Sequence, residues 1–202
     1  MVGGSRHGGA QDAAAERENA RDAELVERLK KGDGRALDEL FRRHRDAAYG
    51  IAYRLLGNRE DALDVVQEAF IHVMRGVEAF RGQSAFRTWL YRIVTHAALD
   101  YRRYRSLRTA ESLDIESVPA RADVASQRTP QEEAADRDLT VAIDKALANV
   151  SEKNRAALVL FAMEGRTYQE VADVLGISVG TVMSRIFNAR QRLRELMASE
   201  IG

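Results

Sequence analysis

The chain has 202 residues with 31 basic and 31 acidic side chains, four His, two Pro and no Cys. This length suits one ordinary domain or two small ones. The lack of cysteine excludes a disulfide scaffold, thiolate zinc sites and a cysteine nucleophile. The apolar runs are too short for a signal peptide or a membrane-spanning helix, so we expect a cytoplasmic protein without membrane insertion.

The charges are distributed unevenly along the chain. Residues 24–106 carry 16 basic and 12 acidic side chains, whereas residues 107–136 carry three and seven. Residues 1–23 are rich in Gly and Ala without apolar periodicity, which predicts a disordered tail. Both prolines fall within 107–136, which predicts a flexible acidic linker. We therefore expect an all-α protein, with an N-terminal helical bundle at 24–106 and a C-terminal four-helix domain at 137–202.

Apolar spacing predicts the helices in chain order. The first domain begins with helices broken near residues 32–34, and an apolar face then continues until Gly57 and Asn58. A third helix is expected at about 59–75. A fourth runs from Ser84, a good N-cap, to about residue 104, with four residues facing inward: Phe86, Leu90, Ile93 and Ala97. The second domain contains helices near 138–149, 151–164, 167–175 and 178–198.

The C-terminal domain carries a helix-turn-helix pattern. Thr167 and Glu170 form a capping box that begins a short helix. Gly176 supplies the left-handed residue that ends it, and Ser178 caps the next helix. A short Gly-containing turn between two helices is typical of helix-turn-helix DNA-binding domains.

The second helix of this pattern has one apolar face and one polar face. The inward positions recur at helical spacing: Val182, Ile186, Ala189 and Leu193. The outward positions hold hydroxyl, amide and guanidinium groups with no carboxylate, which suits base edges and phosphates in a major groove. The predicted DNA-contacting residues here are Thr181, Ser184, Arg185, Asn188 and Arg190. The alternative is a helical hairpin with a solvated basic face.

The stretch 80–105 alternates aromatic and arginine residues, in a domain that holds ten of the thirteen Phe, Tyr and Trp residues. Aromatic rings that stack on bases, beside arginines that contact phosphates, fit single-stranded nucleic acid. The loop 82–84 offers polar groups for an extruded base. The predicted strand-binding residues are Ser84, Arg87, Trp89, Tyr91, Arg92, His96 and Arg103. The alternative is that Trp89 and Tyr101 are core aromatics and the arginines form a solvated face.

The preceding helix is acidic, and Asp61, Asp64 and Glu68 share one of its faces. Three interpretations are open: a divalent-metal site, a solvated face, or a docking face for a basic partner. A rigid helix face rarely supplies all the ligands of a hard cation.

Three motifs in this order resemble bacterial RNA polymerase sigma factors of the extracytoplasmic-function (ECF) group. They are Asp61–Phe70, Phe80–Ile93 and the helix-turn-helix at Tyr168–Arg194. The resemblance implies that an acidic face docks on the clamp-helix coiled coil of core RNA polymerase, through Asp61, Asp64, Gln67 and Glu68. It also implies that the linker threads the polymerase active-site and RNA-exit path, and that an anti-sigma factor commonly holds the protein inactive.

The same resemblance assigns promoter DNA to both domains. The loop 80–84 and the helix after it would recognise and open the −10 element, with Tyr91, Arg92 and His96 at matching positions, and the C-terminal domain would read the −35 element. Relatives often have basic residues where Met183 and Asn188 stand here. We therefore expect three residues to carry more of the −35 contact: Thr181, Ser184 and Arg185.

Two rival functions follow from the residues. A stand-alone helix-turn-helix regulator would use 24–105 for dimerisation or sensing and would bind palindromic duplex DNA without polymerase. A metal-dependent nuclease would use Asp61, Asp64 and Glu68. The second rival lacks a phosphate-binding Gly-rich loop and a nucleophile–base pair, and the four His are scattered. The sequence thus predicts no catalytic residue, no metal and no cofactor.

Overall fold

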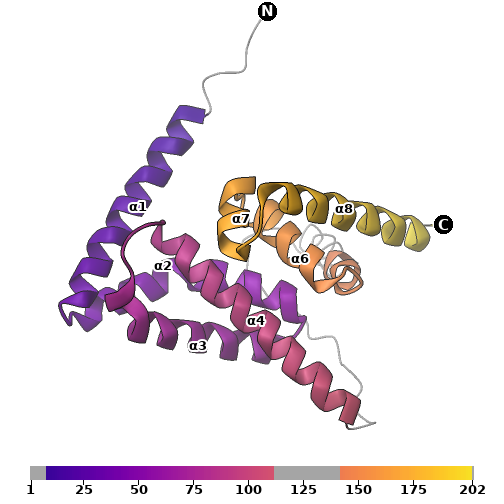
Figure 1. The fold of residues 1–202 in the computed structure, drawn as a ribbon, viewed down its shortest axis with the longest axis horizontal. Helices are drawn as coiled ribbons and strands as arrows, with labels where there is room; N and C mark the ends of the chain where they lie inside the picture. The colour runs from indigo at the N-terminus through magenta and orange to yellow at the C-terminus, as the bar shows by residue number, and fades with distance from the viewer. Residues whose placement is uncertain (1–7, 112–141, 202) are drawn as a thin grey trace, which may run out of the picture.

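The computed structural model describes residues 8–111 and 142–201, which are built of helices joined by short turns and contain no strand (Figure 1). The N-terminal half contains α1 (Gly8–Lys30), α2 (Gly34–Leu56), α3 (Arg59–Gly76), the 3₁₀ turn η1 (Val77–Ala79) and α4 (Phe86–Glu111). The C-terminal half contains a helical segment at 142–148, then α6 (Glu152–Leu158), the π-helical η2 (Val159–Met163), α7 (Tyr168–Leu175) and α8 (Val179–Ile201). The linker predicted at 107–136 is wrong for residues 107–111, which belong to α4, and the rest of it lies outside the described residues.

The breaks between the first three helices are those that the sequence predicts. Asp33 caps α2, its side chain accepting a hydrogen bond from the Arg35 amide at 3.0 Å. Gly57 ends α2 in the left-handed region, at φ 73°. Asn58 then caps α3 by accepting hydrogen bonds from the amides of Glu60 and Asp61 at 2.8 and 3.1 Å. These short-range signals fix the helix boundaries because each satisfies groups that a helix end leaves open.

The prediction of a disordered tail at 1–23 is wrong for residues 8–23, which belong to α1. Asp22 is only 1% exposed, and its carboxylate pairs with Arg43 at 2.9 Å and with His44 at 2.8 Å on α2. Leu25 and Val26 are buried beside it. Local composition pointed to disorder because it cannot reveal partners more than twenty residues away.

Helix α4 differs from its prediction at its start and in its register. It begins at Phe86, and the Ala85 carbonyl accepts the first hydrogen bonds, from the amides of Thr88 and Trp89 at 3.0 and 3.2 Å, so Ser84 is not its N-cap. Phe86 and Leu90 are buried as predicted, whereas Ile93 and Ala97 are only half-buried. Instead the buried positions extend around the helix to Thr88, Tyr91, Val94, Thr95 and Ala98. The buried face is wider because α4 packs against both halves of the molecule.

The two helical domains predicted from the sequence are confirmed, and they touch. Helices α2, α3 and α4 pack against one another, while α6 and α7 pack on α8. Across the boundary α7 lies on α4, and α6 and η2 contact α2 (Figure 1). Buried apolar side chains of both domains form one continuous core. No helix in the described ranges has the length and apolar character needed to cross a membrane.

Candidate nucleic-acid interface

The helix-turn-helix forms as the sequence predicts. The Thr167 side chain accepts a hydrogen bond from the Glu170 amide at 3.2 Å, and the Glu170 carboxylate accepts one from the Thr167 amide at 2.9 Å. Gly176 ends α7 at φ 64°. Ser178 caps α8 by accepting a hydrogen bond from the Thr181 amide at 3.2 Å. These caps fix the angle at which α8 leaves the turn.

Helix α8 exposes most of the polar residues predicted to contact duplex DNA. Of its four predicted inward residues, Val182, Ile186 and Ala189 are buried and Leu193 is half-buried against the core, which confirms the apolar face. Thr181, Ser184, Asn188 and Arg190 are exposed, and Arg185 is half-buried. The Arg190 guanidinium lies 5.3 Å from the centre of the Phe161 ring. It therefore makes a cation–π contact within its own domain.

Sequence reasoning missed Phe187, which is 62% exposed on the same helix, beside Met183 at 52%. A large apolar side chain in this position is open to contact with a thymine methyl group or with a protein partner. The signal was present in the sequence, because Phe187 lies outside the inward set at 182, 186, 189 and 193.

Three of the residues predicted to bind the −10 strand lie against α7 and the turn before it. The Arg87 guanidinium is 3.3 Å from the Glu170 carboxylate. The Tyr91 hydroxyl donates a hydrogen bond to the Glu164 carboxylate at 3.2 Å, and Tyr91 is only 4% exposed. Arg92 donates to the Asp173 carbonyl. The structure therefore places this part of the predicted strand-binding surface in the contact between the domains.

Burial changes the ionisation of the groups in this contact. Burial raises the pKa of the Tyr91 hydroxyl, and the neighbouring Glu164 charge raises it further. Burial also raises the pKa of Glu164, although the hydrogen bond from Tyr91 and the charge of Arg166 oppose the change. Tyr91 therefore remains a neutral hydrogen-bond donor at neutral pH.

Trp89 belongs to an aromatic cluster. Its ring stacks on Phe80 with 4.8 Å between ring centres and meets Phe86 edge-on at 6.0 Å. It is half-buried, and its six-membered ring lies beside Gly76. This placement favours the core role that the sequence left open for Trp89. Among the other predicted residues, Ser84 is half-buried, whereas His96 and Arg103 are exposed.

The acidic helix α3 exposes only part of its predicted docking face. Asp64, Gln67 and Glu68 are exposed. Asp61 is instead turned towards α4, where it accepts a hydrogen bond from the Tyr101 hydroxyl at 2.6 Å and pairs with Arg105. That hydrogen bond raises the pKa of Tyr101, and burial and the Asp61 charge add to the effect.

Apolar side chains interrupt the acidic face of α3. Leu63 and Met74 are each 51% exposed, and Ile71 is 37% exposed. Together with Asp64, Gln67 and Glu68 they form a mixed stripe, which we call the α3 face. Such a surface buries apolar area on binding while its carboxylates select a basic partner.

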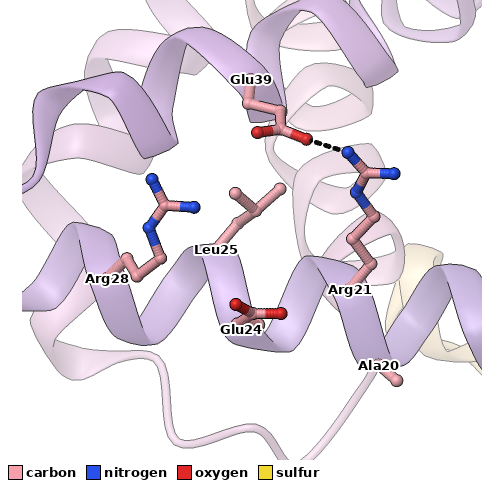
Figure 2. A pocket seen from close by; sticks show the side chains of 6 residues that line it. All are labelled: Ala20, Arg21, Glu24, Leu25, Arg28 and Glu39. Atoms are coloured by element: carbon pink, nitrogen blue, oxygen red, sulfur yellow. Dashed lines mark hydrogen bonds and ion pairs between the residues drawn. The ribbon is translucent and has the colours of Figure 1, made fainter.

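The described part of the chain offers no cluster of side chains suited to a metal ion. A groove of about 470 Å³ lies between α1 and α2. It is lined by Ala20, Arg21, Glu24, Leu25, Arg28 and Glu39 (Figure 2). Arg21 and Glu39 pair at 2.5 Å, and Arg28 pairs with Asp33 at 2.7 Å. None of the predicted site residues lines this groove.

Comparison with known protein families identifies both halves of the chain. Residues 40–108 match the family described as Sigma-70 region 2, and residues 140–193 match Sigma-70, region 4. The region 2 match contains the α3 face and most of α4, and the region 4 match contains the helix-turn-helix. These two regions define the class as a sigma-70-type transcription initiation factor.

Similarity to individual proteins identifies the group of sigma factors to which the chain belongs. The ECF RNA polymerase sigma-E factor of Haemophilus influenzae is 35% identical over 180 residues, covering 87% of this chain and 95% of the relative. The RNA polymerase sigma-H factor of Pseudomonas aeruginosa is 36% identical, covering 85% and 91%. A solved structure of CnrH with the cytosolic domain of CnrY aligns with a TM-score of 0.65 and 28% identity, covering 89% of this chain and 98% of that one. The chain belongs to the ECF sigma factors, and it directs RNA polymerase to promoters.

Proposed function

We propose that promoter recognition is divided among three surfaces of the chain. The α3 face docks on the clamp-helix coiled coil of core RNA polymerase, α4 and the loop before it capture the melted −10 strand, and α8 reads the −35 duplex. The observation that carries this proposal is the polar face of α8, which the helix-turn-helix leaves exposed at Thr181, Ser184 and Asn188.

The −35 assignment rests on the chemistry of α8. Hydroxyl and amide groups at exposed positions can reach base edges, and Arg185 can reach a base edge or a phosphate. Met183 and Phe187 add apolar contact to this face. At position 183 relatives often carry a basic residue instead. Affinity at this element therefore depends less on phosphate neutralisation and more on base contact than in a relative with two more cations.

The polymerase assignment rests on the α3 face. Its exposed carboxylates at Asp64 and Glu68 lie beside Leu63 and Ile71, so charge and apolar area are combined on one helix. Asp61 helps to hold this face in position, because its contacts with Tyr101 and Arg105 join α3 to α4.

The −10 assignment rests on exposed polar side chains within α4. Arg92, His96 and Arg103 are exposed and lie beyond the buried face of the helix. Capture of the separated strand offsets the cost of unstacking its bases, so promoter melting is driven by binding rather than by chemistry at a catalytic residue. The proposed function therefore requires no enzymatic step in this chain.

Control by an anti-sigma factor is the fourth part of the proposal. The similar protein CnrH has been solved in complex with the cytosolic domain of CnrY. The exposed apolar residues Phe187 and Met183 on α8 give a protein partner a surface that overlaps the DNA-reading face. A partner seated there would exclude −35 DNA.

The test is run-off transcription by purified core polymerase on a promoter library, with and without this chain. We expect promoter-specific transcripts that depend on the chain, and we expect Asp64→Arg to abolish holoenzyme formation while the fold is retained. Asp46→Arg is the matched control, because the Asp46 side chain is 90% exposed on α2 and does not belong to the α3 face.

Normal holoenzyme formation by Asp64→Arg would show that the docking assignment is wrong. Palindromic duplex binding without any effect on polymerase would favour the stand-alone regulator.

A further inference from the structure

One aromatic side chain of the C-terminal domain contacts a residue that the proposed function assigns to DNA. We propose that Phe161 is a positioning residue for Arg190, because its ring holds the Arg190 guanidinium at the edge of α8, within reach of a phosphate of the −35 duplex. Phe161 itself does not contact DNA in this proposal and acts only through Arg190. The inference rests on the proposed role of α8.

Phe161 contacts both a second aromatic ring and the arginine. Its ring stacks on that of Tyr168, the first residue of α7, with 4.6 Å between the ring centres and 9° between the ring planes. The Arg190 guanidinium lies 5.3 Å from the centre of the Phe161 ring. Phe161 and Tyr168 are half-buried and pack against the core, whereas Arg190 is exposed. The ring is therefore fixed by its own domain, and the cation that it holds remains open to solvent.

The backbone around Phe161 is irregular. Phe161 lies within η2, a π-helical turn that follows α6. Turns of this kind are rare and occur mostly singly within α-helices, frequently at functional sites. The irregular turn coincides with the residue to which we assign the positioning role.

Arg190 lies at the edge of the polar face of α8. It stands three residues after Phe187 and seven after Met183, so these three side chains share one side of the helix. Ser184 and Asn188, which the proposed function assigns to bases, lie on the strip beside it. Side chains along the middle of a recognition helix reach base edges, whereas those at its flanks reach the phosphates on the walls of the groove. Arg190 is therefore placed for a phosphate rather than for a base.

A ring contact orients a guanidinium without using its hydrogen-bond donors. The N–H groups of arginine lie in the plane of the guanidinium, so a ring against its flat face leaves them available to a phosphate. Holding the side chain before DNA arrives also reduces the conformational freedom that is lost on binding. Positions 183 and 188 of this helix hold Met and Asn, which carry no charge. The orientation of each arginine on α8 therefore has a larger effect on the phosphate contact.

The test compares variants of the full chain for binding to short fluorescein-labelled duplexes. One duplex has a random sequence, and the other carries the upstream half of a promoter that the run-off selection recovers. Phe161→Leu removes the ring and keeps an apolar side chain against the core, whereas Phe161→Tyr keeps the ring. Arg190→Ala removes the guanidinium, alone and combined with Phe161→Leu. Arg45→Ala, on α2, is the control for the lost charge, because the Arg45 side chain is 55% exposed.

We expect Phe161→Leu to bind both duplexes about threefold more weakly than the parent, which corresponds to the loss of one exposed cation–π contact. Because the contact is to a phosphate, this factor should be the same for both sequences, and the slope of log K against log salt should fall by up to about one. Phe161→Tyr and Arg45→Ala should bind like the parent. In the Arg190→Ala background, Phe161→Leu should have no further effect.

A purely structural role for Phe161 gives a different result. Phe161→Leu would then weaken binding equally with and without Arg190, and this outcome overturns the proposal, as does equal binding by Phe161→Leu and the parent. Circular dichroism checks that each variant keeps its helices.

Arg190→Lys tests the same contact without a change in the core, because Lys keeps the charge and lacks the flat guanidinium. We expect it to bind both duplexes more weakly than the parent, and equal binding would overturn the proposal even if Phe161→Leu did not fold. A failure of the proposed −35 role is separate, since it appears as equal affinity of the parent for the selected and the random duplex.

Discussion

Asp22 is a carboxylate that two cationic partners hold in the interior. Burial by itself would raise its pKa, but the hydrogen bonds and charges of His44 and Arg43 outweigh that effect, so the pKa of Asp22 is lowered. A carboxyl group whose pKa is lower in the folded state stabilises the fold above its unfolded pKa, and this contribution is lost as the pH falls through the folded value. The contribution of Asp22 to the packing of α1 on α2 therefore depends on pH.

We expect Asp22→Asn to lower the free energy of unfolding by about 1–3 kcal/mol at pH 7, because hydrogen bonds between charged groups are lost inside the protein. The difference from the parent should shrink as the pH falls below about 4, where the Asp22 carboxyl group protonates first in the unfolded chain and, at lower pH, in the folded protein. Urea unfolding at several pH values measures both effects. Asp46→Asn, at an exposed site on α2, should change stability by less than about 0.5 kcal/mol. A difference that does not vary with pH would contradict the assignment.

At the scale of single helices, the DNA-reading role that we propose for α8 depends on Arg185. Its side chain is half-buried and so has less freedom to lose on binding than a fully exposed arginine. We expect Arg185→Ala to weaken binding of −35 duplex by about 1–3 kcal/mol. Arg45→Ala on α2 should leave that affinity unchanged. Holoenzyme footprinting and transcript yield provide the measurement, and an unaltered footprint would remove Arg185 from the −35 contact.

Elements with strong local signals were predictable from the sequence. The capping box of α7, the left-handed Gly176 and the Ser178 cap all act within four residues, so the pattern determines them. The inward face of α8 was predictable for the same reason. The register of α4 was not, because Tyr91 is buried against Glu164, which lies 73 residues further along the chain. Asp61 looked like an exposed docking residue because its partners lie forty residues further on.

At the scale of the whole molecule, Arg155 joins the two domains. It is 2% exposed, and besides the Leu55 carbonyl it donates to the carbonyls of Ala148 and Val150, each at 2.8 Å. Burial, together with the nearby charge of Arg102, lowers the pKa of Arg155 to about 10, so the side chain remains charged at neutral pH. A buried cation held by backbone carbonyls ties the segment before α6 to the end of α2.

We expect Arg155→Met to lower the free energy of unfolding by about 3 kcal/mol, because the Ala148 and Val150 carbonyls lose a partner inside the protein. Arg45→Met is the control, since the Arg45 side chain is 55% exposed. Thermal unfolding followed by circular dichroism compares the two variants. Equal midpoints for both would mean that water replaces the guanidinium at no cost.

The sequence predicted two helical domains but could not place them relative to each other. Periodicity identifies which face of a helix is apolar, and it carries no information on which of two apolar partners will cover that face. The wide buried face of α4 is the result, since one side packs on α2 and α3 and another on α7. The predicted −10 residues Arg87 and Tyr91 were expected to be open, and the structure places them beneath residues of the other domain.

The contact between Glu170 and Arg87 joins two parts of one polypeptide, so its formation is a first-order process. Its equilibrium therefore does not depend on the cellular amount of this sigma factor, and dilution cannot release it. Binding to polymerase is second-order and rises with the concentration of unoccupied core enzyme. The contact between the two halves should therefore form to the same extent in dilute and in concentrated protein, whereas the share of chains bound to polymerase depends on the concentrations of both partners.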